Sequence, residues 1–427
     1  MTTFSNWTFS ITGEKGATGP SGASGATGPG APLTSSATAP VSPSAGDLWF
    51  NTTTGASYIY YNSAWVELGG GSMSPMQTTS SARPAAPWEG QTIYDTDTNI
   101  GYQYDGTNFA PTYPGSGFRN VLINGDMRIN QRGASYTSIG YTLDRWYLGV
   151  TGDYTVSQST STPPANFQNF MRVQRTNGST NTAVPQIAHS LETSASIPLQ
   201  GKQVTVSFYA RAGANYSPTS STLNYRIYGG TGTDQNIFSY TGQAIVNDLS
   251  VTLTTSWQRF TYTTSALTSY NEYGLFFFCN PTGTAGANDY FDITGVQLEA
   301  NPQPTPFEQR PIGTELALCQ RYYCVVASGS SFVSNAVMHT TTDFESVIHL
   351  PTVMRTAPTL VATTGASYYA IYALNVTKRV DLLTNASNNL SNLRIYGSLV
   401  STTSTAGVGA GLYLQSASAS IAASAEL

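Results

Sequence analysis

The histidines are the first residues to weigh for chemistry, because imidazole serves both as a metal ligand and as a general base. There are three, His189, His339 and His349, with no HExxH pattern and no companion ligand at a metal-binding spacing. No GxSxG or GxxxxGK(S/T) motif occurs either. We therefore expect each histidine to have a packing or surface role, and we predict no catalytic residue, no metal and no cofactor.

Glycoside cleavage would need two carboxylates on opposite sides of a cleft. Asp289 with Asp292, or Asp126 with Asp144, could be nominated, but nothing in their spacing separates them from turn residues and salt-bridge partners. An acidic side chain near Arg128 is instead expected to make a charge-assisted bond that fixes the start of a domain. We predict that the chain is not an enzyme, and a polysaccharide depolymerase stays as an alternative.

The composition favours strands and argues against several partners. Only 10% of the residues are charged, against about 25% in ordinary globular proteins, whereas tyrosine, glycine and β-branched residues are common. The 18 Lys and Arg form no basic cluster, so we expect no nucleic-acid partner. No apolar run approaches the roughly 18 residues of a membrane span, and the N-terminal segment does not resemble a signal peptide. We expect a soluble protein made in a cytosol.

The cysteines show no CxxC or CxxH spacing and predict no zinc site or disulfide framework: Cys279, Cys319 and Cys324.

Residues 13–30, GEKGATGPSGASGATGPG, form six Gly-X-Y triplets. Three polyproline-II strands can wind together only when every third residue is glycine, because nothing larger fits at the axis. The run therefore predicts a homotrimer, whereas a flexible linker is the alternative. Six triplets are too few to hold three chains together alone, so downstream modules must add to trimerisation. The predicted axis residues are Gly13, Gly16, Gly19, Gly22, Gly25 and Gly28.

A repeat follows this run. Residues 46–66 align with residues 90–110 at a constant offset of 44, so that Trp49 matches Ile93 and Tyr58 matches Tyr102. Each copy predicts a strand, a polar turn, a second strand, a turn and a short third strand. A unit of about 20 residues cannot bury its aromatic side chains alone. We expect these side chains to form a core between chains around a three-fold axis, rather than a binding surface.

Residues 116–310 carry strands at the spacing of a jelly-roll β-sandwich. KQVTVSFYARAG alternates polar residues with Val204, Val206 and Phe208. In DYFDITGVQLEA the apolar residues change parity after Gly295, which predicts a β-bulge there.

Residues 311–323 are expected to form a linker helix, in which Thr314 would cap TELALCQRYY. One stripe of this helix is predicted to carry Leu316, Cys319, Gln320 and Tyr323. Residues 324–427 return to strand patterns and predict a β-rich C-terminal head.

Sugar binding is the chemistry that the aromatic residues could supply. Proteins bind glycans through aromatic faces packed on C–H patches, with amides and carboxylates for the hydroxyl groups. In the head, ASYYAIYALN is not cleanly amphipathic, so some of its tyrosines are expected to face outward. For the two tryptophans of the sandwich, a core position is the simpler interpretation. The candidate ligand-binding residues are Tyr368, Tyr369, Tyr372, Tyr396, Trp146 and Trp257.

Several phrases make the chain resemble tail fibre proteins of tailed bacteriophages. They are NVLINGDMRINQRG (120–133), YTLDRWY (141–147), FDITGVQLE (291–299), FEQRPIGTELALCQRYY (307–323) and LPTVMRTAPTL (350–360). The resemblance implies an elongated homotrimer in the virion, assembled in the host cytoplasm. Its N-terminal end would attach to a tail or baseplate protein, and its C-terminal end would meet a host cell-surface glycan.

The sandwich region also resembles carbohydrate-binding jelly rolls, in which the first and last strands are neighbours. That would set NVLIN beside FDITGVQLE. Such modules often hold a structural calcium near this junction, for which Asp126, Asp292 and Glu299 would be the oxygen donors here. Arg128 lies where the module often has an acidic residue, and a cation there opposes calcium binding.

These observations predict an all-β, multidomain homotrimer that mediates phage adhesion by multivalent glycan recognition. A bacterial collagen-like surface adhesin is the alternative from another class. The expected segments are a virion-attachment segment (1–12), a collagen-like stem (13–30), hairpin module 1 (31–68), a spacer with hairpin module 2 (69–115), the jelly roll (116–310), the linker helix (311–323) and the receptor-binding head (324–427).

Overall fold

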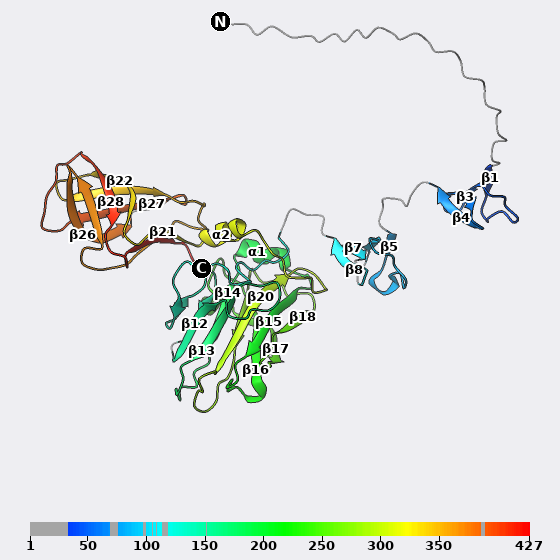
Figure 1. Ribbon diagram of the computed structural model, residues 1–427, viewed down its shortest axis with the longest axis horizontal. Helices are drawn as coiled ribbons and strands as arrows, with labels where there is room; N and C mark the ends of the chain where they lie inside the picture. The colour runs from blue at the N-terminus through cyan, green and yellow to red at the C-terminus, as the bar shows by residue number, and fades with distance from the viewer. Residues whose placement is uncertain are drawn as a thin grey trace, which may run out of the picture. The chain divides into compact units, whose positions relative to one another are not determined.

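A computed structural model describes residues 33–68, 76–96, 100–104, 106–107, 109–112, 118–150, 152–385 and 389–427 (Figure 1). The predicted attachment segment and all six glycines of the collagen-like run lie outside these ranges. With 43% strand and 7% helix, the chain is all-β, as predicted. It divides into two compact units, Met1–Thr112 and Tyr113–Leu427. In the described part of the chain, no helix has the length and hydropathy of a membrane span.

The first unit contains two small sheets of the same design. Each has three antiparallel strands, as the repeat predicts, and a fourth strand that pairs in parallel with the first of them. The bond from Gly46 N to the carbonyl of Tyr60 (2.8 Å) recurs as Gly90 N to Tyr104 (2.7 Å). The strands of the first sheet are β1 (Leu33–Ser36), β2 (Leu48–Asn51), β3 (Ser57–Tyr61) and β4 (Ala64–Leu68). Those of the second are β5 (Met76–Thr78), β6 (Thr92–Asp95), β7 (Ile100–Tyr104) and β8 (Phe109–Thr112), and the short 3-10 helix η1 (Ser80–Ala82) lies between β5 and β6.

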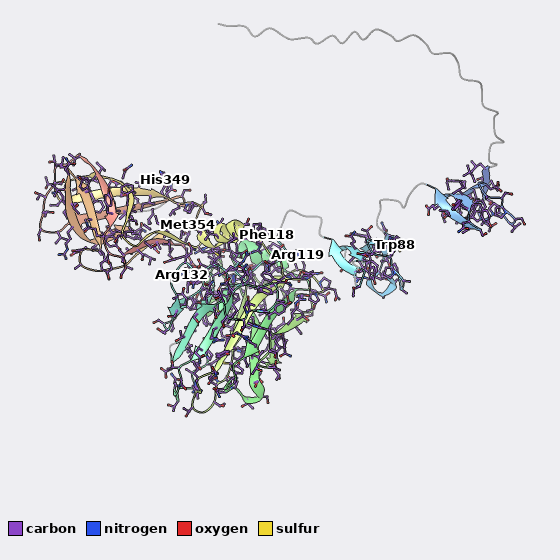
Figure 2. The ribbon with its side chains drawn as sticks, in the orientation of Figure 1. Trp88, Phe118, Arg119, Arg132, His349 and Met354 are labelled. Carbon is purple, nitrogen blue, oxygen red and sulfur yellow. The ribbon has the colours of Figure 1, made fainter. Side chains whose placement is uncertain are left out.

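Each module buries aromatic or aliphatic side chains within one chain. Trp49 is 7% exposed and stacks on Tyr58 with ring centroids 4.8 Å apart, and Ile93 and Tyr102 are fully buried. The expectation that such a unit cannot bury its aromatics alone is therefore wrong for these residues, because the fourth strand widens the sheet. Trp88, which Figure 2 labels, stays 67% exposed, so a core between chains remains a prediction for side chains of that kind.

An ion pair in the second module gives a testable prediction. Arg83 Nε lies 3.0 Å from a buried Asp95 carboxylate oxygen, and its guanidinium carbon lies 4.1 Å from the Tyr102 ring centroid. Arg83→Ala leaves that carboxylate without its donor and should destabilise the module by about 1–3 kcal/mol, measured by hydrogen exchange along β6. Module 1 carries Ala39 and Asn51 at the equivalent positions. The double variant Arg83→Ala, Asp95→Asn should therefore recover much of the loss, and an equal loss in both variants would contradict this account.

The second unit begins with a β-sandwich of two six-stranded sheets, as predicted. Its core contains inward-facing residues of both sheets, including Phe208, Phe277 and Ile293. One sheet has the order β10 (Gly140–Tyr141), β11 (Tyr147–Leu148), β14 (Gln186–Ser190), β19 (Glu272–Phe278), β16 (Thr222–Gly230) and β17 (Ala244–Thr252). The other has the order β18 (Gln258–Thr263), β15 (Thr205–Ala212), β20 (Tyr290–Glu299), β13 (Phe170–Arg175), β12 (Tyr154–Ser159) and β9 (Ser135–Tyr136). Short helices lie in the connections between these strands: α1 (Thr193–Ser196), η2 (Ile197–Leu199), η3 (Thr219–Ser221) and η4 (Ile237–Ser239).

The predicted bulge at Gly295 is present, and the segments NVLIN and FDITGVQLE are neighbours as predicted. Gly295 has φ +60°, and the pairing of β20 with β15 shifts register at this point. The shift lets apolar residues on both sides of Gly295 face the core. Val121 N donates to the carbonyl of Leu298 at 2.9 Å, so NVLIN does lie beside FDITGVQLE.

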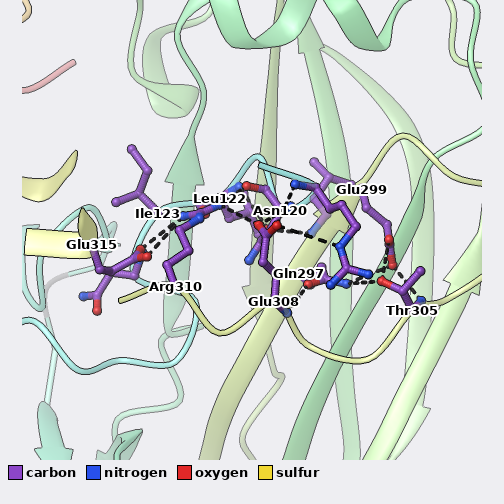
Figure 3. A network of polar contacts seen from close by, with 12 residues as sticks. Asn120, Leu122, Ile123, Gln297, Glu299, Thr305, Glu308, Arg310 and Glu315 are labelled. Atoms are coloured by element: carbon purple, nitrogen blue, oxygen red, sulfur yellow. Dashed lines mark hydrogen bonds and ion pairs between the residues drawn. The ribbon is translucent and has the colours of Figure 1, made fainter. Parts of the chain in front are cut away.

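Charged side chains fix this junction (Figure 3). Arg310 donates to the carbonyl oxygens of Leu122 (3.1 Å) and Asn120 and to Glu315 (3.2 Å). Glu308 accepts hydrogen bonds from the backbone N–H groups of Arg119 and Asn120, both at 3.0 Å. The start of the sandwich is thus held by residues that follow its last strand. The expected acidic partner of Arg128 is Asp126.

The linker helix α2 spans Ile312–Gln320, inside the predicted range 311–323, and begins before the predicted cap at Thr314. Pro311 occupies the N-cap position, and Thr314 lies inside the helix, so the predicted cap is wrong. Proline is well suited to the start of a helix because its φ is already fixed near the helical value. Glu315 is buried together with Cys319, since Arg310 neutralises its carboxylate. The predicted stripe did not include Glu315.

The head contains a closed six-stranded barrel and a three-stranded sheet. Its core includes Phe344, Ile371 and Leu412. The barrel order is β22 (Ser331–Met338), β23 (Asp343–His349), β27 (Asn392–Leu399), β26 (Val376–Asn385), β25 (Tyr369–Ala373) and β28 (Gly409–Leu414), which closes on β22. The small sheet has the order β21 (Tyr323–Ser328), β29 (Ser420–Ser424) and β24 (Thr359–Ala362).

Glu426, which follows β29, links the head to the sandwich. Its carboxylate pairs with Arg132 at 2.5 Å and with the buried Arg145. Gln131 adds a hydrogen bond to the carbonyl of Tyr323 at 2.8 Å. The sandwich and the head are thus joined by ionic contacts as well as by α2.

Candidate functional site

The strand order of the barrel brings three aromatic side chains together on the head. β28 lies between β22 and β25, with Tyr413 opposite Phe332 and Gly411 opposite Tyr372. Alternate residues of a strand face opposite sides of a sheet. Leu412 is fully buried in the barrel, so Gly411 and Tyr413 face outward. We call the surface around these residues the aromatic groove.

The three rings of the aromatic groove are close to one another and accessible. The ring centroids of Phe332 and Tyr413 are 5.1 Å apart, and those of Tyr372 and Tyr413 are 6.4 Å apart, both with edge-to-face geometry. Phe332 is 52% exposed and Tyr372 is 43% exposed. A Cβ atom at Gly411 would lie 2.9 Å from the Tyr413 ring and 3.1 Å from the Phe332 ring. Glycine at 411 therefore leaves the space between the rings open.

Two hollows meet at these rings. The first has a volume of about 740 Å³ and the second about 530 Å³, and both are lined by Phe332, Tyr372 and Tyr413. The other residues of the first hollow are Ser330, Ser331, Thr377, Leu414 and Gln415. Those of the second are Asn335, Ala336, Ala373, Leu374, Asn375, Gly409, Ala410 and Gly411. The described lining thus combines aromatic rings with hydroxyl and amide groups and contains no charged side chain.

A strained hairpin borders the second hollow and gives a prediction. Leu374 and Asn375 join β25 to β26 with φ +53° and +58°. Asparagine adopts this region readily, whereas other L-residues pay about 1–2 kcal/mol. Leu374→Asn should therefore raise the free energy of unfolding by about 0.5–1 kcal/mol, measured by thermal unfolding. Leu382, which is 61% exposed on a strand, provides the control. An equal gain from Leu382→Asn would show that lost surface hydrophobicity, not relieved strain, is responsible.

Two of the sequence candidates cannot present a face to a ligand. Trp146 is fully buried, and its Nε1 donates to the carbonyl of Asn124 at 3.0 Å. Tyr369 is 1% exposed, and its hydroxyl donates to the carbonyl of Thr363 at 2.5 Å. Both are core residues with satisfied polar atoms, so their assignment as ligand-binding residues is wrong.

The remaining candidates lie apart from one another. Tyr372 is in the aromatic groove, whereas Tyr396 on β27 lines a separate hollow of about 500 Å³ with Asp343 and Asp381. Tyr368 packs half-buried against the head core. Trp257, on the sandwich, is half-buried and donates to a backbone carbonyl at 2.8 Å. The predicted tyrosine cluster is thus not one site.

Sequence reasoning missed Phe332 and Tyr413. Each lies in a short alternating segment, SSFVS and GAGLYLQ, with a single outward aromatic residue. That alternation was a usable signal for two outward rings. Nothing in either segment shows that the two residues face each other.

The outer face of the sandwich carries a second hollow with aromatic residues. It has a volume of about 690 Å³ and lies at the bulge of β20, where Phe167 and Tyr209 have ring centroids 5.2 Å apart. A Cβ atom at Gly295 would lie 2.5 Å from the Phe167 ring. Arg259 also lines this hollow, so its chemistry differs from that of the aromatic groove.

The carboxylates nominated for calcium are engaged by protein donors. Asp292 lies between two arginines, with Arg172 Nε and Arg211 Nε both at 2.8 Å. Glu299 accepts from Thr305 N at 2.9 Å, and Asp126 pairs with Arg128. Two guanidinium groups at one carboxylate oppose calcium there. No group of three metal-ligating side chains occurs in the described ranges.

The carboxylate pairs nominated for glycoside cleavage make structural contacts. Asp289 pairs with the buried Arg175 at 3.3 Å, and Asp144 accepts from Gln131 N at 2.8 Å. His189 is buried against Trp146, and burial lowers its pKa well below the usual value. This is the packing role expected of it. In the head, the hydrogen bond from Arg394 lowers the pKa of Glu345 to about 2.

Comparison with known proteins adds little to this description. No protein-family model matches the chain, and no curated protein matches it. A solved structure titled "CBM4 structure and function" is 18% identical and covers 42% of this chain and 99% of its own, with a TM-score of 0.27. A tandem CBM22 domain of Xyn10C from Paenibacillus barcinonensis is 11% identical (73% and 100% covered, TM-score 0.29). The enzymatically active domain of tailspike protein 4 from bacteriophage CBA120 is 14% identical (44% and 24% covered, TM-score 0.28). The fold and the site therefore rest on the strand pairings above.

Proposed function

We propose that this chain is a tail fibre protein of a tailed bacteriophage, and that its head binds a glycan of the host cell surface. The observation that carries the binding proposal is the aromatic groove, where exposed rings lie among hydroxyl and amide groups. This combination suits sugars, which present C–H patches and hydroxyl groups on the same ring. The collagen-like triplets and the phrases that resemble those of phage fibres support the assignment to a virion.

In this proposal the working unit is a homotrimer attached by its N-terminal end to a tail or baseplate protein. Each head binds weakly, and several sites engage the same surface at once. Linked sites raise the apparent affinity by about 10²–10⁴ without any new contact. Weak individual sites then suffice for firm attachment.

The test uses the full-length protein on an array of bacterial surface polysaccharides and their oligosaccharides. We expect binding to a subset of these glycans, and at least a tenfold weaker signal for the double variant Phe332→Ala, Tyr372→Ala. The matched control is Tyr61→Ala, because Tyr61 is 68% exposed on a strand of module 1. A double variant that binds like the wild type would move the site out of the head. Absence of binding to every glycan would remove the proposed function.

A further inference from the structure

The two hollows of the aromatic groove share one floor, which points to a ligand longer than either hollow. Each volume, about 740 and about 530 Å³, lies within the usual 300–1,000 Å³ of a small-ligand site. They meet at the three rings that line both of them, and the second hollow continues along one row of the sheet, in which Asn335, Gly411 and Tyr372 lie side by side on β22, β28 and β25. Gly411 is the lowest point of this row, since it has no side chain.

Each hollow also provides an unused amide. Gln415 lines the first hollow and Asn335 the second, and both residues are exposed. Within the described residues, neither amide group has a hydrogen-bond partner in the protein. Each can therefore donate to and accept from a ligand hydroxyl group. The groove thus repeats one combination, an amide beside an aromatic face, on both sides of Gly411.

The charges around the groove restrict the ligand further. Lys378 follows Thr377 of the lining, but its ammonium donates to the carbonyl of Thr403 at 2.6 Å. The next arginine, Arg379, pairs with Asp381. A uronate or phosphate placed in the groove would lose water and gain no cation. Burying such a group without a partner is unfavourable.

From these observations we infer that the aromatic groove binds an uncharged oligosaccharide of at least two sugar units that crosses β28 at Gly411. One part of the ligand lies in the hollow beside Gln415 and the other in the hollow beside Asn335. The rings of Phe332, Tyr372 and Tyr413 pack against it at the crossing. This inference rests on the proposed glycan binding and specifies the charge and minimum length of the glycan.

The test measures the affinity of the full-length protein by calorimetry for neutral hexose and N-acetylhexosamine oligosaccharides of one to six units and for their uronate-containing counterparts. The wild type should bind the neutral series at least tenfold more tightly than the uronate series. Its affinity should rise once the oligosaccharide is too long to fit within one hollow. Gly411→Val places methyl groups between the rings. It should flatten this dependence on length while the shortest ligands that bind keep their affinity.

Gly313→Val is the matched control. Gly313 lies in α2 outside both hollows, and a Cβ atom there meets nothing within 4 Å. This variant should keep the dependence on length. Equal or tighter binding of the uronate series, or equal length dependence in wild type and Gly411→Val, would overturn the inference while leaving glycan binding intact. If no oligosaccharide binds, the proposed function itself fails. Light scattering completes the test, because a changed oligomeric state in Gly411→Val would identify the groove as a contact between subunits and overturn the inference.

Discussion

Glu426→Gln is expected to lower the free energy of unfolding of the second unit by about 3–5 kcal/mol, the usual cost of removing one partner from a buried ion pair. The wild-type carboxylate is held by Arg132 at 2.5 Å and by Arg145, whose side chain is 1% exposed. Burial alone would lower the pKa of Arg145, but the combined effect of Glu426, Tyr322 and Tyr141 outweighs it and holds the pKa above its usual value. Glutamine keeps the shape of the side chain and removes the charge. The guanidinium group then stays buried beside the carbonyl of Ser190 and the rings of Tyr322 and Tyr141, whose centroids lie 3.5 and 6.0 Å from its carbon, and it has no carboxylate partner among the described residues.

Urea unfolding measures this loss, and limited proteolysis between α2 and β22 reports whether the head separates from the sandwich. Glu345→Gln is the control, because Glu345 pairs with Arg394, whose side chain is 46% exposed. An exposed pair of this kind contributes little to the free energy of unfolding, because water screens the attraction between its charges. Equal losses of unfolding free energy in the two variants would show that the ion pairs of Glu426 do not hold the head to the sandwich.

Arg310→Lys is expected to lower the free energy of unfolding by about 2–3 kcal/mol, although it conserves the charge. Arg310 donates to two backbone carbonyl groups and to Glu315, and its guanidinium carbon lies 4.5 Å from the Phe118 ring centroid. An ammonium group is a single point of charge and cannot reach these partners together. The carbonyl oxygens that it leaves are buried, so each is left without its donor.

Thermal unfolding of the full chain measures this effect, with Arg379→Lys as the matched control. Arg379 pairs with Asp381 at the surface, where the two side chains are 43% and 34% exposed. There a lysine should replace the arginine with little change in the free energy of unfolding, because water screens an exposed pair. A similar loss at both positions would indicate a general preference for arginine, and the network of Figure 3 would then not be responsible.

Local patterns in the sequence predict much of the fold. The change of parity at Gly295 predicts the bulge because side-chain alternation is a property of one strand. The strands β1 and β5 were missed because LTSS and MQT show no apolar alternation. These two segments are strands because their backbones pair in parallel with β2 and β6, and a local pattern does not show such a pairing. The N-terminus of α2 was misplaced because a threonine that could cap a helix follows a proline that already begins one.

The candidate site was harder to predict because it depends on strand order. Alternation in YYAIYA does separate an inward Tyr369 from an outward Tyr372. Phe332 and Tyr413 are opposite each other only because the barrel closes β28 on β22. The burial of Trp146 likewise follows from residues far along the chain, since Phe277 covers its ring. Contacts between distant segments are set by tertiary packing, which a single sequence without a strand order does not reveal.

The joining of NVLIN to the last strand of the sandwich has a kinetic consequence. Asn120 and Val296 are hydrogen-bonded although 176 residues separate them. Contacts of such high sequence separation form late and slow the search for the native state. A barrier of this kind is met again in the reverse direction, when these same contacts must break. In the proposed role outside a cell, no chaperone refolds an unfolded molecule. The rate of unfolding, more than the free energy of unfolding, therefore sets the working lifetime of the protein.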